Sequence, residues 1–463
     1  MERKWLTLVA VAAGIFMLLL DVTIVNVALP DIEQAFHASL SDLQWVIDAY
    51  ALTLAALQLT AGSLADRFGR RLLFSIGIVV FTLGSLLCGL ASGSTFLSLS
   101  RAFQGIGGAI MFATGLAIIA NAYHGRDRGV AFGVFGAVTG IAVAVGPVIG
   151  GALTSGLSWR WIFLVNIPVG VVALVITIRA VTESKDPNPR PVDFLGLGTF
   201  SLGLALLVFG LIRSNEDGWG SATVAGSLVA AVVLLVAFVA AEALQKQPMF
   251  DLTLFRKPAF VGGLIAAFAI SASLFSLFPY LVIYMQAGLG LSAIDIGVRF
   301  LVLSGPIFFT AAIAGRLTEK VPTKFLIGPG FLCVGIAQLL MRGLDPTSDW
   351  THFIPGFLVA GIGAGFINVP LASTAVGVVE PARAGMASGI NSTFRQVGIA
   401  TGVAALGAIF SHHVTSAATP VAGFVDGLNS IMLVGAVLAF GAAVTSLTLI
   451  RSRDFVRSQP VAA

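Results

Sequence analysis

The stretch GSLADRFGRR, residues 62 to 71, places Asp66, Arg67, Arg70 and Arg71 in one short turn. Only 10% of the 463 residues are charged and 57% are hydrophobic, so this turn stands apart from most of the chain. Apolar segments of about 20 residues flank it on both sides, which is the length that a helix needs to cross a bilayer. The turn therefore joins two predicted membrane spans.

Such apolar segments recur along the whole chain, whose mean hydropathy is +0.98. We predict an all-α integral membrane protein of fourteen spans, in which many of the 53 glycines allow close helix packing. The predicted spans are 5–29, 44–65, 72–92, 96–120, 130–154, 160–182, 194–213, 221–243, 258–286, 294–316, 324–342, 351–375, 385–411 and 429–450.

The basic residues indicate how these spans are oriented. Positive charge gathers in cytoplasmic loops of membrane proteins. With the N-terminus inside, the cytoplasmic segments hold all of the 26 Lys and Arg residues except Arg101, Arg160, Arg213, Arg299, Arg342 and Arg395. We therefore predict a multi-pass protein of the cytoplasmic (inner) membrane, with both termini in the cytoplasm. The net charge of +4 reflects this topology, and we expect no nucleic-acid partner.

A second stretch, GRLTEKVPTK at 315–324, aligns with the opening one and pairs Gly62 with Gly315 and Asp66 with Glu319. The match is weak and chance is an alternative, but both copies follow the second span of a six-span set. Parallel six-helix repeats are typical of one large transporter fold. The sequence predicts an N-terminal bundle at 1–183, a linker with two extra spans at 184–257, and a C-terminal bundle with a short tail at 258–463.

Further motifs extend this pattern over both halves. They are LDVTIVNVALP (20–30), RAFQGIGGA (101–109), the glycine run from Gly136 to Gly151, WRWIFLVNIP (159–168) and ASGINSTFRQVG (387–398). Together with GSLADRFGRR they resemble the major facilitator superfamily, and within it the fourteen-helix drug:proton antiporters. The resemblance implies the major facilitator fold, with two six-helix bundles and two extra central helices. It also implies proton-coupled efflux of drugs or lipophilic monocations by alternating access.

The resemblance assigns gating roles to two glycine-containing motifs. Asp66 and its arginines would hold the two halves together on the cytoplasmic side, and Gly62 and Gly69 would permit the tight turn. The alternative is a solvated loop that only follows the charge bias. The glycines and proline of the fifth span would limit leak, or would serve only close packing. The gating residues are Gly62, Asp66, Arg67, Gly69, Arg70, Arg71, Gly136, Gly140, Gly146, Pro147 and Gly150.

Charged residues within spans are costly and suggest function. Asp21 is expected about 12 Å from the outer end of the first helix at 1.5 Å per residue, in the same layer as Asp48 and Arg101. We predict that Asp21 carries the driving proton and that Arg101 tunes it, a pairing that the resemblance also implies. Arg101 could instead serve backbone carbonyls. Asp48 could neutralise a drug cation, carry a second proton, or lie at the interface with water.

Two further positions and a set of large apolar side chains complete the predicted substrate site. Dication exporters of this family carry acidic residues in the late helix where this chain has Asn391 and Arg395, which disfavours dications. Large apolar pockets with a few polar groups are typical ligand sites. Besides Asp48, Asn391 and Arg395, the predicted lining residues are Phe16, Met17, Met111, Phe112, Phe275, Phe278, Tyr284 and Phe366, for each of which ordinary packing or lipid contact is the alternative.

No motif for catalysis, metal binding or nucleotide binding appears in the sequence. We therefore expect a transporter and not an enzyme, with no cofactor and with the proton gradient as its energy source. The expected partners are small lipophilic or cationic substrates, protons and membrane lipids, and we expect a monomer. Two alternatives remain open: a dedicated exporter of one metabolite or antibiotic, and a proton-coupled importer, which the fifth-span motif disfavours.

Overall fold

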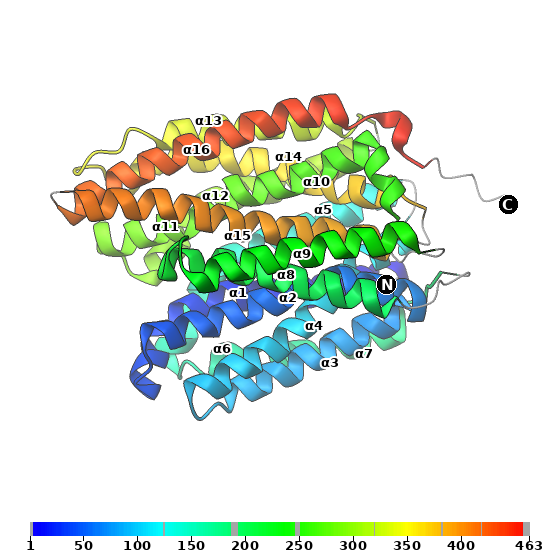
Figure 1. Cartoon of the computed structure of the whole chain (residues 1–463), viewed down its shortest axis with the longest axis horizontal. Coiled ribbons are helices and arrows are strands. Elements are labelled where there is room, and N and C mark those ends of the chain that lie inside the picture. The colour runs from blue at the N-terminus through cyan, green and yellow to red at the C-terminus, as the bar shows by residue number, and fades with distance from the viewer. Residues whose placement is uncertain are drawn as a thin grey trace.

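The computed structural model describes residues 3–123, 126–186, 193–245, 251–318, 320–380, 383–417 and 419–456. In these ranges the chain is helical apart from its connections. The predicted all-α membrane architecture is thus confirmed (Figure 1). We refer to α1–α7 as the N-terminal half and to α10–α16 as the C-terminal half, following the division predicted from the sequence.

The helices of the N-terminal half are α1 (Arg3–Phe36), α2 (Leu40–Phe68), α3 (Arg70–Gly89), α4 (Ser94–Ala122), α5 (Arg126–Gly156), α6 (Trp161–Leu164) and α7 (Asn166–Ala180). The extra pair is α8 (Phe194–Asp217) and α9 (Ala222–Leu244). The C-terminal half contains η1 (Leu252–Arg256), α10 (Pro258–Ser273), η2 (Phe275–Leu277), α11 (Phe278–Ile283), η3 (Tyr284–Gly288), α12 (Ala293–Leu317), α13 (Lys324–Met341), η4 (Trp350–Phe353), α14 (Ile354–Gly377), α15 (Ala384–Ser416), α16 (Pro420–Leu449) and η6 (Ser452–Asp454).

Thirteen of the fourteen predicted spans recur as described segments that are long and apolar enough to cross a membrane. The fourteenth, predicted at 130–154, is α5, a helix of 31 residues. At about 1.5 Å per residue that length exceeds the thickness of a bilayer core. The predicted span 258–286 is not one continuous α-helix, because a 3-10 turn at η2 and a π-helical turn at η3 interrupt it.

The two halves meet along two helix pairs, and the aligned stretches 62–71 and 315–324 contribute α2 to one pair and α12 to the other. α2 packs against α15, and α5 packs against α12. A Cβ at Gly62 of α2 would clash with the carbonyl oxygen of Gly385, and a Cβ at Gly315 of α12 would clash with that of Gly129. The two aligned glycines thus occupy equivalent close crossings between the halves.

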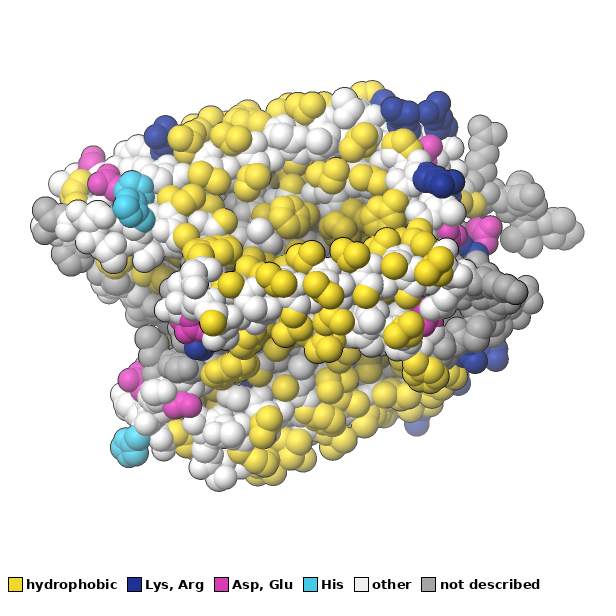
Figure 2. Space-filling view, in the orientation of Figure 1, with side chains coloured by type: hydrophobic (Ala, Val, Ile, Leu, Met, Phe, Trp, Pro, Cys, Tyr) yellow, Lys and Arg dark blue, Asp and Glu magenta, His cyan; other side chains and the backbone are white. Residues whose placement is uncertain are grey.

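The extra pair α8–α9 covers one side of the α2–α15 crossing, because α8 contacts both of those helices. Figure 1 shows this pair between the blue N-terminal helices and the orange α15. Apolar side chains of α9 such as Val229, Val232 and Val236 are exposed. Figure 2 shows hydrophobic side chains across the middle of this face, as a surface in contact with lipid requires.

The same orientation shows where the ends of the chain lie. α1 begins and α16 ends at the right-hand end of the bundle in Figure 1, which we call the terminal end. On the visible face, the Lys and Arg side chains lie mainly at this end (Figure 2).

Candidate transport site

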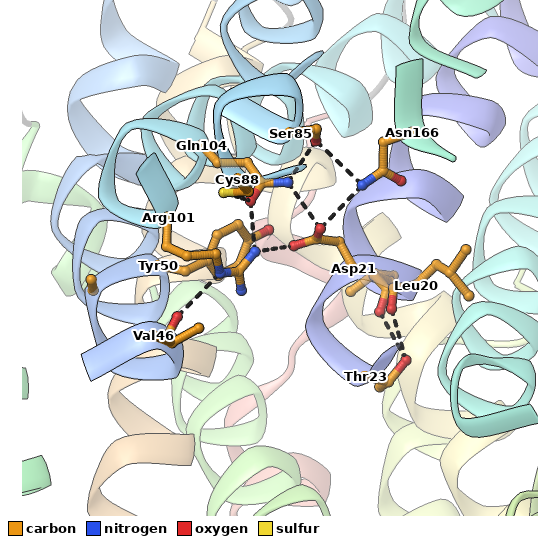
Figure 3. Close-up of polar contacts among 12 residues, drawn as sticks. Leu20, Asp21, Thr23, Val46, Tyr50, Ser85, Cys88, Arg101, Gln104 and Asn166 are labelled. Atoms are coloured by element: carbon orange, nitrogen blue, oxygen red, sulfur yellow. Dashed lines mark hydrogen bonds and ion pairs between the residues drawn. The ribbon is translucent and has the colours of Figure 1, made fainter. Parts of the chain in front are cut away.

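A buried polar cluster lies inside the N-terminal half, centred on Asp21 of α1 and Arg101 of α4 (Figure 3). Asp21 is 0% exposed and Arg101 is 2% exposed. Arg101 Nη1 donates a hydrogen bond to Asp21 Oδ2 and forms an ion pair with it. The two residues that the sequence placed in one layer are therefore in direct contact.

Two amide side chains complete the coordination of this carboxylate. Gln104 Nε2 donates to Asp21 Oδ1 at 2.9 Å, and Asn166 Nδ2 donates to the same oxygen at 3.1 Å. Both amides also donate to Ser85 Oγ, at 2.7 and 3.3 Å. Sequence reasoning missed these residues, although Gln104 and Asn166 lie in motifs that it had singled out.

Arg101 also makes contacts beyond its carboxylate. Its Nε donates to the carbonyl of Val46 at 3.1 Å, and its Nη1 donates to Gln104 Oε1 at 2.6 Å. The guanidinium lies 4.2 Å from the ring centroid of Tyr50, within range of a cation–π interaction. The backbone contact that the sequence left as an alternative thus exists together with the ion pair.

Asp48 lies outside this cluster. Among the described residues no hydrogen bond or ion pair joins it to Asp21 or Arg101. Its charged neighbours are Arg213 and Glu216 of α8, and nearby Trp45 packs on Phe209 with ring centroids 5.9 Å apart. Asp48 therefore belongs to the contact between α2 and the extra pair.

The opening motif forms a second polar site, at the terminal end between the two halves. Asp66 Oδ1 accepts from Gly385 N at 3.0 Å, and Asp66 Oδ2 accepts from Met386 N at 2.8 Å. Arg70 donates to Asp66 from both Nε and Nη2, at 2.9 and 2.8 Å. The carboxylate thus caps the N-terminus of α15, where backbone N–H groups attract anions.

A second acidic residue supports this site from the segment after α7. The carboxylate of Glu183 accepts from the backbone N–H groups of Arg71 at 2.9 Å and Leu72 at 3.1 Å. It lies against Gly69, whose φ of 120° favours glycine. The sequence offered no signal for Glu183, since this contact spans 112 positions. Of the other predicted gating residues in this turn, Arg71 lies 3.9 Å from Glu183 and Arg67 lies over the ring of Phe68.

The N-terminus of α15 also contacts the start of η1, within its own half. Arg383 Nη1 and Asp251 Oδ2 are 2.5 Å apart. Burial raises the pKa of Asp251, but hydrogen bonds from Thr253 and Arg383 outweigh it and leave this pKa below its ordinary value. Asp251 is therefore a stable counter-charge for Arg383 at neutral pH.

The glycines of α5 face two different neighbours. A Cβ at Gly136 would lie 2.6 Å from Val369, and one at Gly140 would lie 3.0 Å from Ile307, both in the C-terminal half. One at Gly150 would lie 2.9 Å from Ile24 of α1, and one at Gly146 would clash with Thr23 of the same helix. Pro147 lies in α5, but its side chain is outside the described part of the chain.

The eight predicted apolar lining residues do not form one cluster. Met17 and Met111 are buried in a core that is mostly N-terminal, on which Phe112 and Phe366 pack, and Phe16 packs on a separate N-terminal core. Phe275 and Phe278 pack on the C-terminal core. Tyr284 lies inside that core and donates to the carbonyl of Ser348, so it does not lie between the halves.

Arg395 of α15 is the other intramembrane arginine with side-chain partners inside the bundle. Its Nη1 donates to Asn368 Oδ1 of α14 at 2.9 Å, and its Nε makes a long contact of 3.5 Å with Asn391 Oδ1. The two predicted residues Asn391 and Arg395 are thus brought together. Arg299, by contrast, pairs with Asp295 at 3.4 Å, as the helical spacing predicted.

Comparison with known proteins agrees with this architecture. The family model of the Major Facilitator Superfamily matches residues 11–403. The chain is 34% identical over its whole length to the puromycin resistance protein pur8 of Streptomyces alboniger, and covers 93% of that protein. It is 33% identical to the multidrug resistance protein Stp of Mycobacterium tuberculosis, with 90% of this chain and 78% of that protein covered.

A solved structure shares the fold at lower identity. The human organic anion transporter MFSD10 (TETRAN) superposes with a TM-score of 0.70 and 14% identity, over 96% of this chain and all of that one. The resemblance stated from the motifs is therefore confirmed, and the chain belongs to the major facilitator superfamily of membrane transporters.

Proposed function

We propose that this protein exports small-molecule drugs or antibiotics in exchange for protons, across the cytoplasmic membrane, by alternating access. The observation that carries the proposal is the fully buried carboxylate of Asp21, which accepts hydrogen bonds from Arg101, Gln104 and Asn166. A buried ionisable group held by a cation changes its whole hydrogen-bond pattern when it binds a proton.

Protonation of Asp21 removes the negative charge that holds the Arg101 guanidinium. The neutral carboxyl carries a donor and cannot accept in all of the directions that the carboxylate does. Arg101, Gln104 and Asn166 must then rearrange, and they connect α1, α4 and α7. A proton at Asp21 thereby favours a different packing of the N-terminal half, which is what coupling requires.

The terminal end supplies the second part of the proposal. We place it in the cytoplasm, because the Lys and Arg residues of the predicted topology gather there. The contact of Asp66 with Gly385 and Met386 then closes the cytoplasmic side, and substrate enters when this contact breaks. In this proposal, the structure with the Asp66 contact formed is the outward-facing state.

The names of the relatives support export and leave its breadth to a direct test. Several are named for one antibiotic, such as a tetracenomycin C resistance and export protein of Streptomyces glaucescens, whereas Stp is named for multidrug resistance. A dedicated exporter of one antibiotic is therefore the second candidate function. Transport of structurally unrelated probes, such as puromycin and ethidium, would favour the broader one.

The coupling proposal is tested in everted vesicles with an acidic interior. The wild type should accumulate whichever of ethidium, puromycin and anthraquinone-2-carboxylate it transports while protons leave, whereas Asp21→Asn should lose at least nine tenths of uphill accumulation of the same probe while it retains binding of that probe. Asp295→Asn is the matched control, because Asp295 is an exposed helix-capping acid of α12 and is not part of the cluster. Uphill accumulation by Asp21→Asn at the wild-type rate would place the proton elsewhere.

A further inference from the structure

Arg395 lies in the membrane-spanning part of α15 without a carboxylate. It is 11 positions after Ala384, about 16 Å along the helix at 1.5 Å per residue. Within the described ranges no Asp or Glu oxygen lies within ion-pair distance of its guanidinium, and its two side-chain partners are the amide oxygens of Asn368 and Asn391. Among the described residues, the positive charge of Arg395 is therefore balanced by amide dipoles and not by a carboxylate.

Other buried polar groups near Arg395 also lack partners. Asn391 Nδ2, Ser388 Oγ and Ser392 Oγ are buried and make no hydrogen bond among the described residues. Positions 388, 391, 392 and 395 follow the spacing of one helix face. Since nearly all buried polar groups in proteins are hydrogen-bonded, a row of unsatisfied ones requires an explanation.

The N-terminal half contributes one more such group. Gln58 of α2 is 0% exposed, and neither its Oε1 nor its Nε2 has a hydrogen-bond partner among the described residues. A Cβ at Gly389 would lie 2.7 Å from the carbonyl oxygen of Gln58, so this residue meets α15 beside Ser388. Gln58 therefore meets the end of the α15 face that carries Ser388, Asn391, Ser392 and Arg395.

Two members of this cluster remain partly accessible. Arg395 and Asn368 are partly exposed, whereas Ser388, Asn391 and Ser392 are buried. A guanidinium presents a planar fork of donors that matches a carboxylate in two parallel hydrogen bonds. A bound anion would also provide the counter-charge that the described protein groups do not supply.

We propose that Arg395, with Asn368, Asn391 and Gln58, binds the anionic group of the transported substrate, and that the preferred substrates are lipophilic carboxylates. This inference rests on the proposed export function and names its substrate class. Among the drugs or lipophilic monocations expected from the sequence, it favours anionic drugs, because an arginine without a carboxylate partner repels a cation. The amides and hydroxyls serve as additional donors and acceptors for the same group.

Binding of two probes that share one ring system tests the charge preference. Anthraquinone-2-carboxylate is ionised at neutral pH, whereas anthraquinone-2-carboxamide is neutral and of nearly the same shape. Isothermal titration of the purified wild type at pH 7, without any gradient, should give a Kd about tenfold or more lower for the carboxylate. Arg395→Met should remove that preference, and Arg395→Lys should retain part of it.

Arg299→Met is the matched control, because Arg299 is an arginine of α12 that pairs with Asp295 near a helix end. It should leave the carboxylate preference unchanged. Equal affinity of the wild type for the two probes, or binding of neither, overturns the inference. So does an Arg395→Met protein that keeps the preference.

Binding without a gradient separates this inference from the proposed function. Loss of the carboxylate preference with intact proton-driven export refutes only the substrate class. Intact preference without any proton-coupled transport refutes only the coupling. Folding of each variant is verified by its elution as a single species and by binding of the neutral carboxamide, which does not need the charge.

Discussion

The two halves of the protein each bury an arginine in the membrane, but in different electrostatic surroundings. Arg101 of the N-terminal half forms an ion pair with Asp21 and donates to the backbone carbonyl of Val46. The ring of Tyr50 lies beside its guanidinium. Arg395 of the C-terminal half has only two amide oxygens as partners among the described residues. Removing a partner from a paired site leaves a buried charge, whereas removing an isolated charge relieves one. The halves thus share equivalent helix crossings, but the partners of their buried arginines differ.

The largest expected effect comes from breaking the paired site. Arg101→Met should abolish uphill transport and lower the stability by roughly 3–5 kcal/mol, because Asp21 then remains buried without its cation. Arg395→Met should leave the thermal midpoint unchanged or raise it. Thermal unfolding of both variants in detergent measures this contrast, and equal losses of stability would mean that the two arginines are electrostatically alike.

The glycine crossings should respond alike, because here the halves are equivalent. Gly62→Leu and Gly315→Leu each place a side chain against a backbone carbonyl of the other half, so both should reduce export by tenfold or more. Gly93→Leu is the control, since a Cβ at Gly93 meets nothing within 4 Å. Export rates in vesicles decide the point, and a defect in only one of the two crossings would count against their equivalence.

The smallest effects are expected at the contact of Asp66 with the N-terminus of α15, at the terminal end. Asp66→Asn should slow export several-fold, since an amide can accept from one of the two N–H groups but its NH₂ opposes the other. Glu183→Gln should slow export about twofold, because Glu183 is partly exposed and acts only through the turn. Labelling of a cysteine introduced at Ala387 should increase more in Asp66→Asn than in Glu183→Gln. Unchanged labelling in Asp66→Asn would mean that Asp66 lies in a solvated loop without a gating role.

These comparisons also indicate how far the site could be predicted from the sequence. Asp21 and Arg101 could be predicted as site candidates because charges are rare in apolar segments. Asp66 could be predicted because it lies in a charged turn to which the resemblance assigns gating. Gln104, Asn166 and Ser85 were missed because neutral polar residues are common in such helices and give no periodic signal. Glu183 was missed because it acts through backbone groups that are 111 and 112 positions away.

The sequence by itself determined that this is a membrane protein and where its spans lie. Thirteen of the fourteen predicted spans match apolar segments of the structure that are long enough to cross a membrane, and the fourteenth matches the long helix α5. Hydropathy and charge distribution are one-dimensional properties, so they can be read without packing. Only the tertiary structure decided that Asp48 faces Arg213 and Glu216, that Tyr284 points into the C-terminal core, and that Arg395 has no carboxylate partner in the described chain. The physical reason is that a helix in a bundle has several buried faces, and the direction in which each side chain points depends on how neighbouring helices cross it.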